Sequence, residues 1–369
     1  MSDLLLIAPP ESRRVRALQN SLLEAGLPPA RVLPWLEILG GEPLEKHIFP
    51  NTIIKLDSPS EDWETDKALL ALGELQPDPD REYARVNPEN LEFDLGAILS
   101  SRQWYLGFCA ALENVNSQLT QMGKRAMNHP TDIALMFDKR ATHAKLESAG
   151  ILVPPALPPI ENFDQLFEHM TQLGWNRVFV KLAHGSGAAG VIALETHKGQ
   201  WQATSTVEMA SGGRLYNTKR LWKYRNLEQI KALVNAICLQ RVHVEKWLPK
   251  ASFENKIFDL RVVVIAGLAK HVLVRSSSGT VTNLHLGNER GHWDGVREKL
   301  GETWLEVKTT CEQCMGLFPN SLYAGVDALV QTDWQHHAIL EMNAFGDYHR
   351  NVFVNGLDTY QTQLEACKG

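Results

Sequence analysis

The sequence predicts an α/β protein with an N-terminal α/β domain and a longer C-terminal region of mixed strands and helices. Its 369 residues exceed the size of one simple core, because domains usually contain about 100 to 200 residues. Short apolar runs alternate with amphipathic stretches over residues 1–72, as β-α units do. A second series of strand-like segments runs from residue 177 to residue 343 and includes a glycine-rich loop.

Composition and charge narrow the function classes. The chain is 44% hydrophobic and 22% charged, which is typical of a globular protein in water. Its net charge of −6 argues against a nucleic-acid partner, and no apolar run is long enough to cross a bilayer, so no membrane partner is expected. The first residues lack the basic segment of a signal peptide, and five cysteines give no disulfide framework, so we expect a cytoplasmic protein.

The N-terminal elements follow from local pattern. A buried strand is expected at residues 4–8, followed by a helix that ends at Gly26. Residues 32–39 fit either a second strand or a short helix. A further strand at 52–56 leads into a helix that runs through Leu72. The turn after the first strand has no G-x-G-x-x-G pattern, so a dinucleotide-binding domain is not predicted.

The middle of the chain begins with a polar, proline-rich loop at 75–96 and a long helix at 98–122. A boundary is predicted near 127–130, and helical sequence continues from there to residue 149. The strands expected after it are at 177–181, 191–194, 242–244, 261–265 and 271–275, and the helices are at 162–173 and 227–239.

The last two strands carry the residues that first indicate a chemistry. Residues 325–330 and 337–343 are separated by a polar turn, which predicts an antiparallel hairpin. Glu341 and Asn343 share one face of their strand, and Asp327 is on the partner strand. Two carboxylates and an amide are ligands that hard divalent cations prefer. The alternative is an edge hairpin with solvated acids, and the pattern alone favours neither.

A glycine-rich loop follows the strand that ends at Lys181. Glycine or serine occupies the loop positions Gly185, Ser186, Gly187 and Gly190. Such a loop can turn tightly and present backbone N–H groups to phosphate, while the lysine supplies a positive charge. It is not a Walker A loop, because the lysine precedes the glycines. By itself the pattern fits a flexible turn at least as well.

Several further polar residues are candidates only as a group. Lys139 alone would be a solvated helix lysine, and the arginines alone would be surface ion-pair residues. The segment Glu245, Lys246 and Trp247 ends a strand, where backbone groups and an aromatic wall could hold an adenine ring. The remaining candidates are Asp259, Arg261, Arg275 and Asn283.

Two other features are given a plainer interpretation. Cys311 and Cys314 have helical spacing and no second cysteine pair, so we expect both thiols to face a core or the helix surface. A basic cluster in a polar stretch fits either an anionic substrate or a solvated surface; it consists of Arg214, Lys219, Arg220 and Lys223.

In their order along the chain, these residues resemble the ATP-grasp superfamily, and within it the glutathione-synthetase-like branch that includes ribosomal protein S6 glutamate ligases. The resemblance covers residues 125–360 and rests on the following positions: Lys139, Lys181 with Gly185-Ser186-Gly187, Glu245-Lys246-Trp247, Asp259-x-Arg261, Arg275, Asn283, Asp327 and Glu341-x-Asn343. Two positions depart from the family pattern. Leu182 stands where the family has proline, and an unusual segment, 344–350, follows Asn343.

The resemblance implies a fold in which two α+β lobes grip ATP behind an N-terminal α/β domain. The implied domains are 1–125, then 126–244 with the phosphate loop, then 245–369 with the metal site. Nucleotide contacts would come from Lys139, Lys181, the loop residues including Gly190, Glu245, Lys246, Trp247 and Asp259. Asp327, Glu341 and Asn343 would hold Mg²⁺, with Mn²⁺ as an alternative, and Arg261, Arg275 and Asn283 would act in catalysis.

The implied activity is an ATP-dependent carboxylate–amine ligase that forms an amide through an acyl phosphate. Its partners would be a small-molecule or peptide carboxylate and an amine donor, and a homodimer is compatible with this scheme. Two alternatives remain open. One is a small-molecule kinase of the same fold, and the other is an ATP-binding regulator without turnover.

Overall fold

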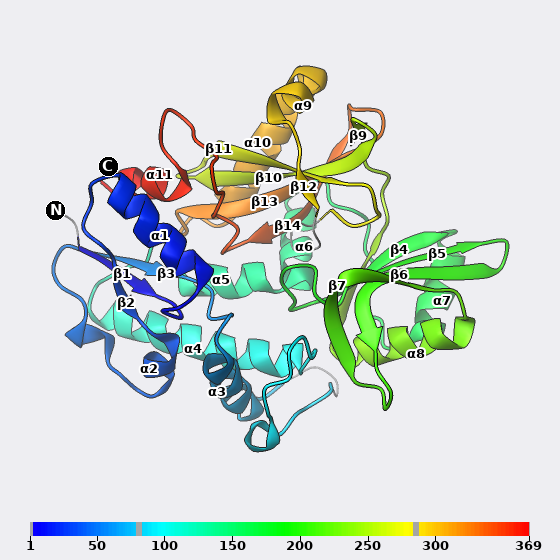
Figure 1. Ribbon diagram of the computed structural model, residues 1–369, viewed down its shortest axis with the longest axis horizontal. Helices are drawn as coiled ribbons and strands as arrows, with labels where there is room; N and C mark the ends of the chain where they lie inside the picture. Colours follow the sequence, from blue (N-terminus) through cyan, green and yellow to red (C-terminus); the bar gives the residue numbers. More distant parts are fainter. Residues whose placement is uncertain (1–2, 79–82, 283–287, 369) are drawn as a thin grey trace.

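The structure, a computed structural model, describes residues 3–78, 83–282 and 288–368, which form three sheets with helices packed against them (Figure 1). The first sheet is parallel, with strand order β2-β1-β3. Its strands are β1 (Asp3–Ile7), β2 (Arg31–Leu33) and β3 (Thr52–Leu56), and its neighbouring helices are α1 (Arg13–Glu24), α2 (Trp35–Leu39), α3 (Trp63–Glu74) and α4 (Ser101–Gln121). This part has the α/β architecture that the sequence predicts.

The ambiguous segment 32–39 contains both of the elements that its pattern allowed. Pro34 separates β2 from α2, because it has no backbone N–H to donate and its fixed φ suits the residue that precedes a helix. Helix α1 begins at a different kind of cap, since the Ser12 hydroxyl accepts a hydrogen bond from the backbone N–H of Val15.

The second sheet is antiparallel, with order β7-β6-β5-β4-β8, and it has a hydrophobic core of its own. Its strands are β4 (Arg177–Leu182), β5 (Ile192–His197), β6 (Gln200–Met209), β7 (Leu215–Tyr224) and β8 (Val242–Lys246), and its core is completed by α7 (Phe163–Gln172) and α8 (Leu227–Cys238). The polar stretch 204–223 therefore lies mostly in the β6–β7 hairpin. Gly212 and Gly213, both at positive φ, form its turn.

The third sheet has the order β12-β11-β10-β13-β14, and β9 pairs with β10. Its strands are β9 (Ser252–Phe253), β10 (Lys256–Ile265), β11 (Leu268–Ser277), β12 (Glu289–Arg290), β13 (Tyr323–Val330) and β14 (His337–Asn343). Helix α10 (Thr303–Gly316) packs against β10, β11 and β13, and α9 (Trp293–Leu300) packs against β11. The antiparallel hairpin predicted at the end of the chain is confirmed as β13–β14.

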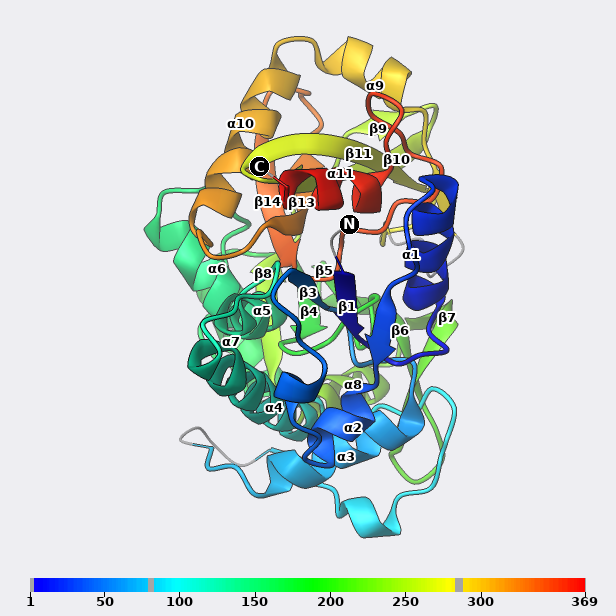
Figure 2. The same cartoon turned by 90° about the vertical axis from the view of Figure 1, so that its left-hand side faces the viewer.

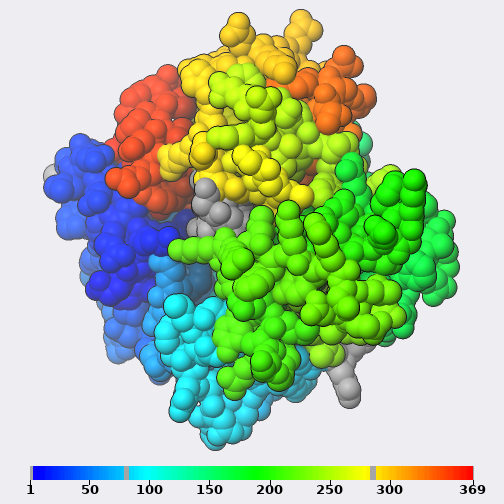
Figure 3. Space-filling model, turned by 45° about the vertical axis from the view of Figure 1, so that its right-hand side comes forward, coloured from blue at the N-terminus to red at the C-terminus, as the bar shows by residue number. Residues whose placement is uncertain are grey.

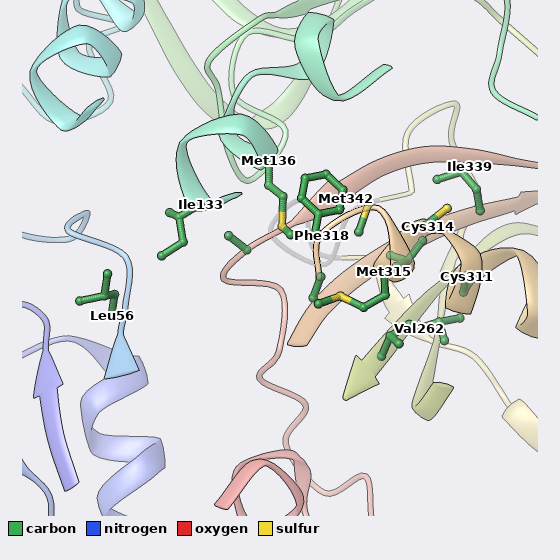
Figure 4. Close-up of a cluster of buried hydrophobic side chains, with 14 of the residues drawn as sticks. Leu56, Ile133, Met136, Val262, Cys311, Cys314, Met315, Phe318, Ile339 and Met342 are labelled. Carbon is green, nitrogen blue, oxygen red and sulfur yellow. The ribbon is translucent and has the colours of Figure 1, made fainter. Parts of the chain in front are cut away.

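A large buried cluster joins the first and third sheets. Helices α5 (Pro130–Phe137) and α6 (Lys139–Ser148) contribute to it, and both contact β14. Figure 4 shows Ile133 and Met136 of α5 between Leu56 of β3 and the third sheet. The segment that follows residue 126 therefore packs with the third sheet first, and only residues from 157 onwards enter the core of the second sheet. The domain limits at 125 and 244 remain a prediction.

The two cysteines of α10 face this same cluster. Cys311 and Cys314 are buried beside Met315 and Phe318 (Figure 4), which confirms the core-facing interpretation of the C-x-x-C pair. Burial also raises the pKa of Cys314 to about 12, so the thiol stays protonated.

Helix α11 (Thr359–Ala366) lies beside α1, so segments near the two ends of the chain share one side of the molecule (Figures 1 and 2). Within the described ranges, every helix is too short or too polar to cross a bilayer.

Candidate active site

A cavity lies between the second and third sheets, and the glycine-rich loop that follows β4 forms part of its lining. Its volume is about 810 Å³, including the part open to solvent. In the space-filling view the second sheet (green) forms a lobe that abuts the third-sheet region (yellow) (Figure 3). The cavity lining includes these residues that the sequence singled out: Lys139, Lys181, Gly185, Ser186, Gly187, Glu245, Lys246, Asp259, Arg275, Asp327 and Glu341.

Lys181 and Glu245 form a buried ion pair on the side of the second sheet. They come from neighbouring antiparallel strands, with Phe179 opposite Glu245 in the register of β4 and β8. Burial opposes ionisation of Glu245, which is 2% exposed, but Lys181 and then His243 together outweigh it and lower the pKa of Glu245 to about 2. Burial likewise opposes the charge on Lys181, and Glu245 and Glu341 raise the pKa of the lysine. Both groups are therefore charged at neutral pH.

Lys139 reaches the cavity from the first residue of α6. The predicted helix breaks at Asp138, which has extended backbone and caps α6 by accepting the N–H groups of Arg140 and Ala141. Lys139 Nζ donates to the carbonyl oxygen of Gly185 at 2.5 Å and lies 3.4 Å from Glu341 Oε2. This one lysine therefore contacts both the glycine-rich loop and the third sheet.

Gly190 is required at the end of the loop, although it does not line the cavity. Its φ is +67°, and a Cβ built there would lie 2.4 Å from Leu182 Cγ. A side chain at this position would therefore meet both backbone strain and a steric clash. Leu182, the residue that departs from the family pattern, is the group that fills this space.

The β13–β14 hairpin brings the three predicted metal ligands together. Asp327 is opposite Glu341, and Asn343 is opposite Gly325. Burial opposes ionisation of Asp327, but Arg261 and then Arg275 outweigh it and hold the pKa of Asp327 well below its usual range. Arg261 Nη2 lies 3.0 Å from Asp327 Oδ2, and Arg275 Nη2 lies 2.9 Å from the same oxygen. Asp327 is an ionised carboxylate whose partners are two arginines.

Arg261 and Asn343 lie next to the cavity without lining it. With its amide oxygen turned towards Arg261, Asn343 accepts from Nη2 at 3.2 Å and donates to Glu341 Oε1 at 3.3 Å. Arg261 also lies close to Gly346, whose carbonyl oxygen is 3.4 Å from Nη1. The segment that follows the hairpin thus packs directly against these two polar residues.

A second carboxylate network lies on the other side of Arg275. Asp259 is fully buried and accepts from Arg275 Nε at 2.6 Å, from Lys250 Nζ at 2.8 Å and from the Thr282 hydroxyl. Sequence analysis missed Lys250, although it lines the cavity, because a lone lysine beside a proline carries no recognisable pattern. Asn283, a predicted catalytic residue, lies outside the described residues.

The apolar part of the cavity was also missed by sequence analysis. Its side chains belong to strands and loops whose apolar residues look like ordinary core positions; they include Phe179, Val191, Leu248, Leu329 and Leu340. Trp247, the expected aromatic wall, is absent from the lining and instead packs on Phe179, with ring centroids 5.0 Å apart. Its part in nucleotide binding remains a prediction.

The basic cluster lies away from these residues. Lys219, Arg220 and Lys223 are exposed on β7, and Arg214, which precedes that strand, lies 3.5 Å from Asp94. None of the four lines the cavity.

The charges around the cavity suit a polyanion with a bound cation. Five Lys or Arg side chains and four carboxylates line it, an excess of one positive charge. Among the described residues no three His, Cys, Asp or Glu side chains form a metal cluster by themselves. The hairpin offers two carboxylates and an amide, and Mg²⁺ commonly combines one or two carboxylates with substrate phosphates. This donor set therefore fits a cation that a phosphate group helps to hold.

No protein-family model and no curated protein matches the sequence. Solved structures do match over nearly the whole chain. The D-cycloserine synthetase DcsG is 13% identical with a TM-score of 0.56, and the match covers 100% of this chain and 99% of DcsG. The macrocyclase MdnC from Microcystis aeruginosa MRC, bound with precursor peptide MdnA, is 9% identical with a TM-score of 0.53, covering 99% and 100%.

The ATP-grasp ligase PsnB, complexed with a minimal precursor, Mg and ADP, is 15% identical with a TM-score of 0.52. That match covers 98% of this chain and 96% of PsnB. At identities this low the similarity establishes the fold alone, so the glutathione-synthetase-like branch remains a prediction. The chain therefore has the ATP-grasp ligase fold along its whole length.

Proposed function

We propose that this protein is an ATP- and Mg²⁺-dependent carboxylate–amine ligase that forms an amide bond. The observation that carries the proposal is the meeting of Lys139, Lys181 and the glycine-rich loop with Asp327 and Glu341 around one cavity. A metal-bound triphosphate needs positive side chains for its phosphates and oxygen ligands for its cation. The lysines of this cavity can meet the first need and the two carboxylates the second.

In this proposal Lys139 and Lys181 contact the α- and β-phosphates, and the loop 185–190 covers them and excludes water. Mg²⁺, held by Asp327, Glu341 and Asn343, would supply charge neutralisation at the β- and γ-phosphates. The apolar walls and the segment 245–248 would surround the adenine. Arg261 and Arg275 would turn from Asp327 to the transferring phosphoryl group or to the substrate carboxylate.

The proposed chemistry has two steps. A carboxylate oxygen of the substrate attacks the γ-phosphorus, the bond to the β-phosphate oxygen breaks, and ADP leaves with an acyl phosphate formed. An amine then attacks the acyl carbon, phosphate leaves with that carboxylate oxygen, and the proton that the amine loses passes to the phosphate. The acyl phosphate would hydrolyse in water, which gives the covering loop a physical purpose.

The substrate class is a carboxylate on a small molecule or a peptide, joined to an amine. Support for both classes comes from the similar structures, since DcsG is named a D-cycloserine synthetase whereas MdnC and PsnB hold precursor peptides. The segment 344–350 next to Arg261 is the part of the chain in which we expect the acceptor to be recognised.

The test is phosphate release from ATP–Mg²⁺ in the presence of paired amino acids and peptides, followed by identification of the product. With a carboxylate that carries a heavy-oxygen label, the released phosphate should contain one labelled oxygen. A stable phosphorylated product would instead indicate a kinase, and ATP binding without turnover by any acceptor pair would indicate a regulator. Either result would contradict the ligase proposal.

A further inference from the structure

His184 lies at the base of the glycine-rich loop, where three segments of the chain meet. It is 4% exposed and stacks on Tyr105 of α4, with ring centroids 4.0 Å apart and planes 21° apart. Its Nε2 lies 3.1 Å from Asp138 Oδ2 and 3.4 Å from Arg102 Nη1. Ring stacking on Tyr105 and the hydrogen bond to Asp138 together restrain the orientation of the imidazole ring.

The residues on either side of His184 also contact Lys139, the residue that follows Asp138. The backbone N–H of Lys139 donates to the Ala183 carbonyl oxygen at 3.0 Å, and Lys139 Nζ donates to the Gly185 carbonyl oxygen. Residues 138–139 and 183–185 therefore share three polar contacts, which we name the loop clamp. One of its members is the lysine proposed to bind phosphate.

The loop clamp joins parts that belong to different cores. Helix α6 packs through Leu146 into the cluster shared by the first and third sheets, whereas Leu182, just before the clamp, belongs to the core of the second sheet. The two cores have no buried residue in common. Contacts that cross between them decide how the glycine-rich loop lies over Lys139 and the third sheet.

The pair at the centre of the clamp is a hydrogen bond between a neutral histidine and a carboxylate. Burial lowers the pKa of His184 to about 4, although Asp138 opposes this change. Burial also opposes ionisation of Asp138, but the hydrogen bond from His184 and those from the backbone N–H groups of Ala141 and Arg140 hold its pKa well below the usual range. Arg102 has its own carboxylate partner, Asp78, at 2.7 Å.

We propose that Asp138 and His184 are positioning residues that fix the glycine-rich loop against Lys139 and so prepare the cavity for nucleotide. This inference rests on the nucleotide site proposed above and adds two residues that touch neither the phosphates nor the metal. They act through Lys139 and the backbone of Gly185. Without their hydrogen bond, the loop would have more conformations to lose when a nucleotide binds, and affinity would fall.

The experiment compares His184→Leu with His184→Gln in the full chain. Leucine fills similar space without a donor, whereas glutamine has an N–H donor at about the distance of Nε2 from the backbone. We measure ATP–Mg²⁺ affinity by isothermal titration, hydrogen exchange of the backbone amides in residues 185–190, and thermal stability. His184→Leu should weaken ATP binding on the order of tenfold and speed exchange in the loop. His184→Gln should restore most of both.

The matched control is His337→Leu. His337 is another buried histidine, it contacts the Thr310 hydroxyl oxygen at 2.8 Å, and it does not line the cavity. Its replacement should lower stability and leave ATP affinity and loop exchange unchanged. A second variant, Asp138→Asn, keeps a good helix cap but removes the charge, and it should weaken ATP binding in a folded protein even where His184→Leu folds poorly.

The outcomes separate the two proposals. Unchanged ATP affinity and loop exchange in both His184→Leu and Asp138→Asn would overturn the loop clamp, whatever happens to stability. Failure of the wild-type protein to bind ATP would overturn the proposed function instead. In that case the exchange rates of residues 185–190, measured without nucleotide, would still confirm or refute the clamp.

Discussion

At the scale of single residues, the ion pair of Lys181 and Glu245 keeps two charged groups at the wall of the cavity. A buried lysine is costly unless a carboxylate compensates it, and here the carboxylate is itself almost fully buried. If a phosphate group binds as proposed, Lys181 gains a second anion, while Glu245 still needs a compensating positive charge. The effect of this ion pair on protein stability can therefore be measured separately from the effect of Lys181 on ATP binding.

Lys181→Met should lower the free energy of unfolding by about 3 to 5 kcal/mol, because it leaves Glu245 buried without its counter-charge. It should also weaken ATP binding at least about tenfold. Adding Glu245→Gln should recover much of the stability without recovering ATP affinity. Urea unfolding and isothermal titration measure the two effects, and equal recovery of both would contradict a phosphate contact by Lys181.

Glu341→Ala should remove turnover, by more than about a hundredfold, while the fold is retained. Its side chain is 26% exposed, so its loss opens no large buried cavity. Phosphate release and circular dichroism provide the measurements. Glu298→Ala, at an exposed position of α9, is the matched control and should behave as wild type. Normal turnover in Glu341→Ala would exclude the metal role of the hairpin.

Asp327 makes a third prediction, which concerns the order of binding. Its two arginine partners compete with a cation for the same oxygens. Mg²⁺ alone should therefore bind weakly, and ATP should strengthen Mg²⁺ binding because phosphate oxygens can take over the arginines. Titration of Mn²⁺ followed by its paramagnetic effect on water, with and without a non-hydrolysable ATP analogue, tests this coupling. Equal Mn²⁺ affinity in both states would refute it.

At the scale of elements, the loop 185–190 and the hairpin β13–β14 have opposite requirements. The hairpin holds its two carboxylates and its amide through a paired register, and all residues of β13 are buried. The loop instead depends on backbone conformations that most side chains disfavour. Gly190 and Gly212 offer a comparison, because both have positive φ but only Gly190 is also enclosed.

Gly190→Ala should destabilise the protein by more than Gly212→Ala and should weaken ATP binding. Both variants carry the cost of alanine at positive φ, about 1 to 2 kcal/mol. Only at position 190 does the new Cβ also meet Leu182, whereas Gly212 has open space around it. Thermal unfolding and ATP titration of the two variants test this, and identical behaviour would show that enclosure by Leu182 is unimportant.

At the scale of the whole molecule, a buried ionic network connects the N-terminal sheet to the segment after the β13–β14 hairpin. Lys55 of β3 is 1% exposed, and its Nζ contacts Asp347 at 2.8 Å and Gln363 of α11 at 3.0 Å. Arg14 of α1 also binds Asp347, and it donates to the carbonyl oxygen of Phe345 at 2.7 Å. This network fixes the segment 344–347 beside Arg261.

Lys55→Met should lower the free energy of unfolding by about 3 to 5 kcal/mol, because Asp347 would lose one of its two buried cationic partners. Lys46→Met, which breaks an exposed pair with Glu42, should change stability by less than about 1 kcal/mol. Urea unfolding of the two variants provides the comparison. Similar small effects would mean that the network contributes little to joining the N-terminal and third sheets.

His184 makes one contribution to the pH dependence of stability, alongside His349, whose pKa burial also lowers to about 4. Its pKa of about 4 in the folded state lies below the unfolded value of about 6.5, so the unfolded state binds more protons between these limits. The contribution of His184 to stability should therefore be nearly complete above pH 6.5 and should be lost, by on the order of 3 kcal/mol, as the pH decreases to about 4. His184→Gln should flatten this part of the profile. An unchanged slope would show that His184 is not the group responsible.

Much of this architecture was accessible from the sequence. The strand and helix pattern of the N-terminal domain, the C-terminal hairpin and the core-facing cysteines follow from local periodicity and turn chemistry, and each is confirmed. The ordered set of lysines, glycines and acids also predicted one shared site through its resemblance to the ATP-grasp superfamily, and most of these residues do line one cavity; that nucleotide binds there stays a prediction.

The tertiary structure decided which segments far apart in the chain come into contact. Lys250 contacts the Thr282 hydroxyl across 32 positions, and His184 meets Asp138 and Tyr105 across more than 40 positions. Trp247 turns towards Phe179 and away from the lining. Local sequence determines which backbone forms and which face of it is apolar. The partner of a buried polar side chain depends on how separately formed sheets pack, and that packing is a property of the whole chain.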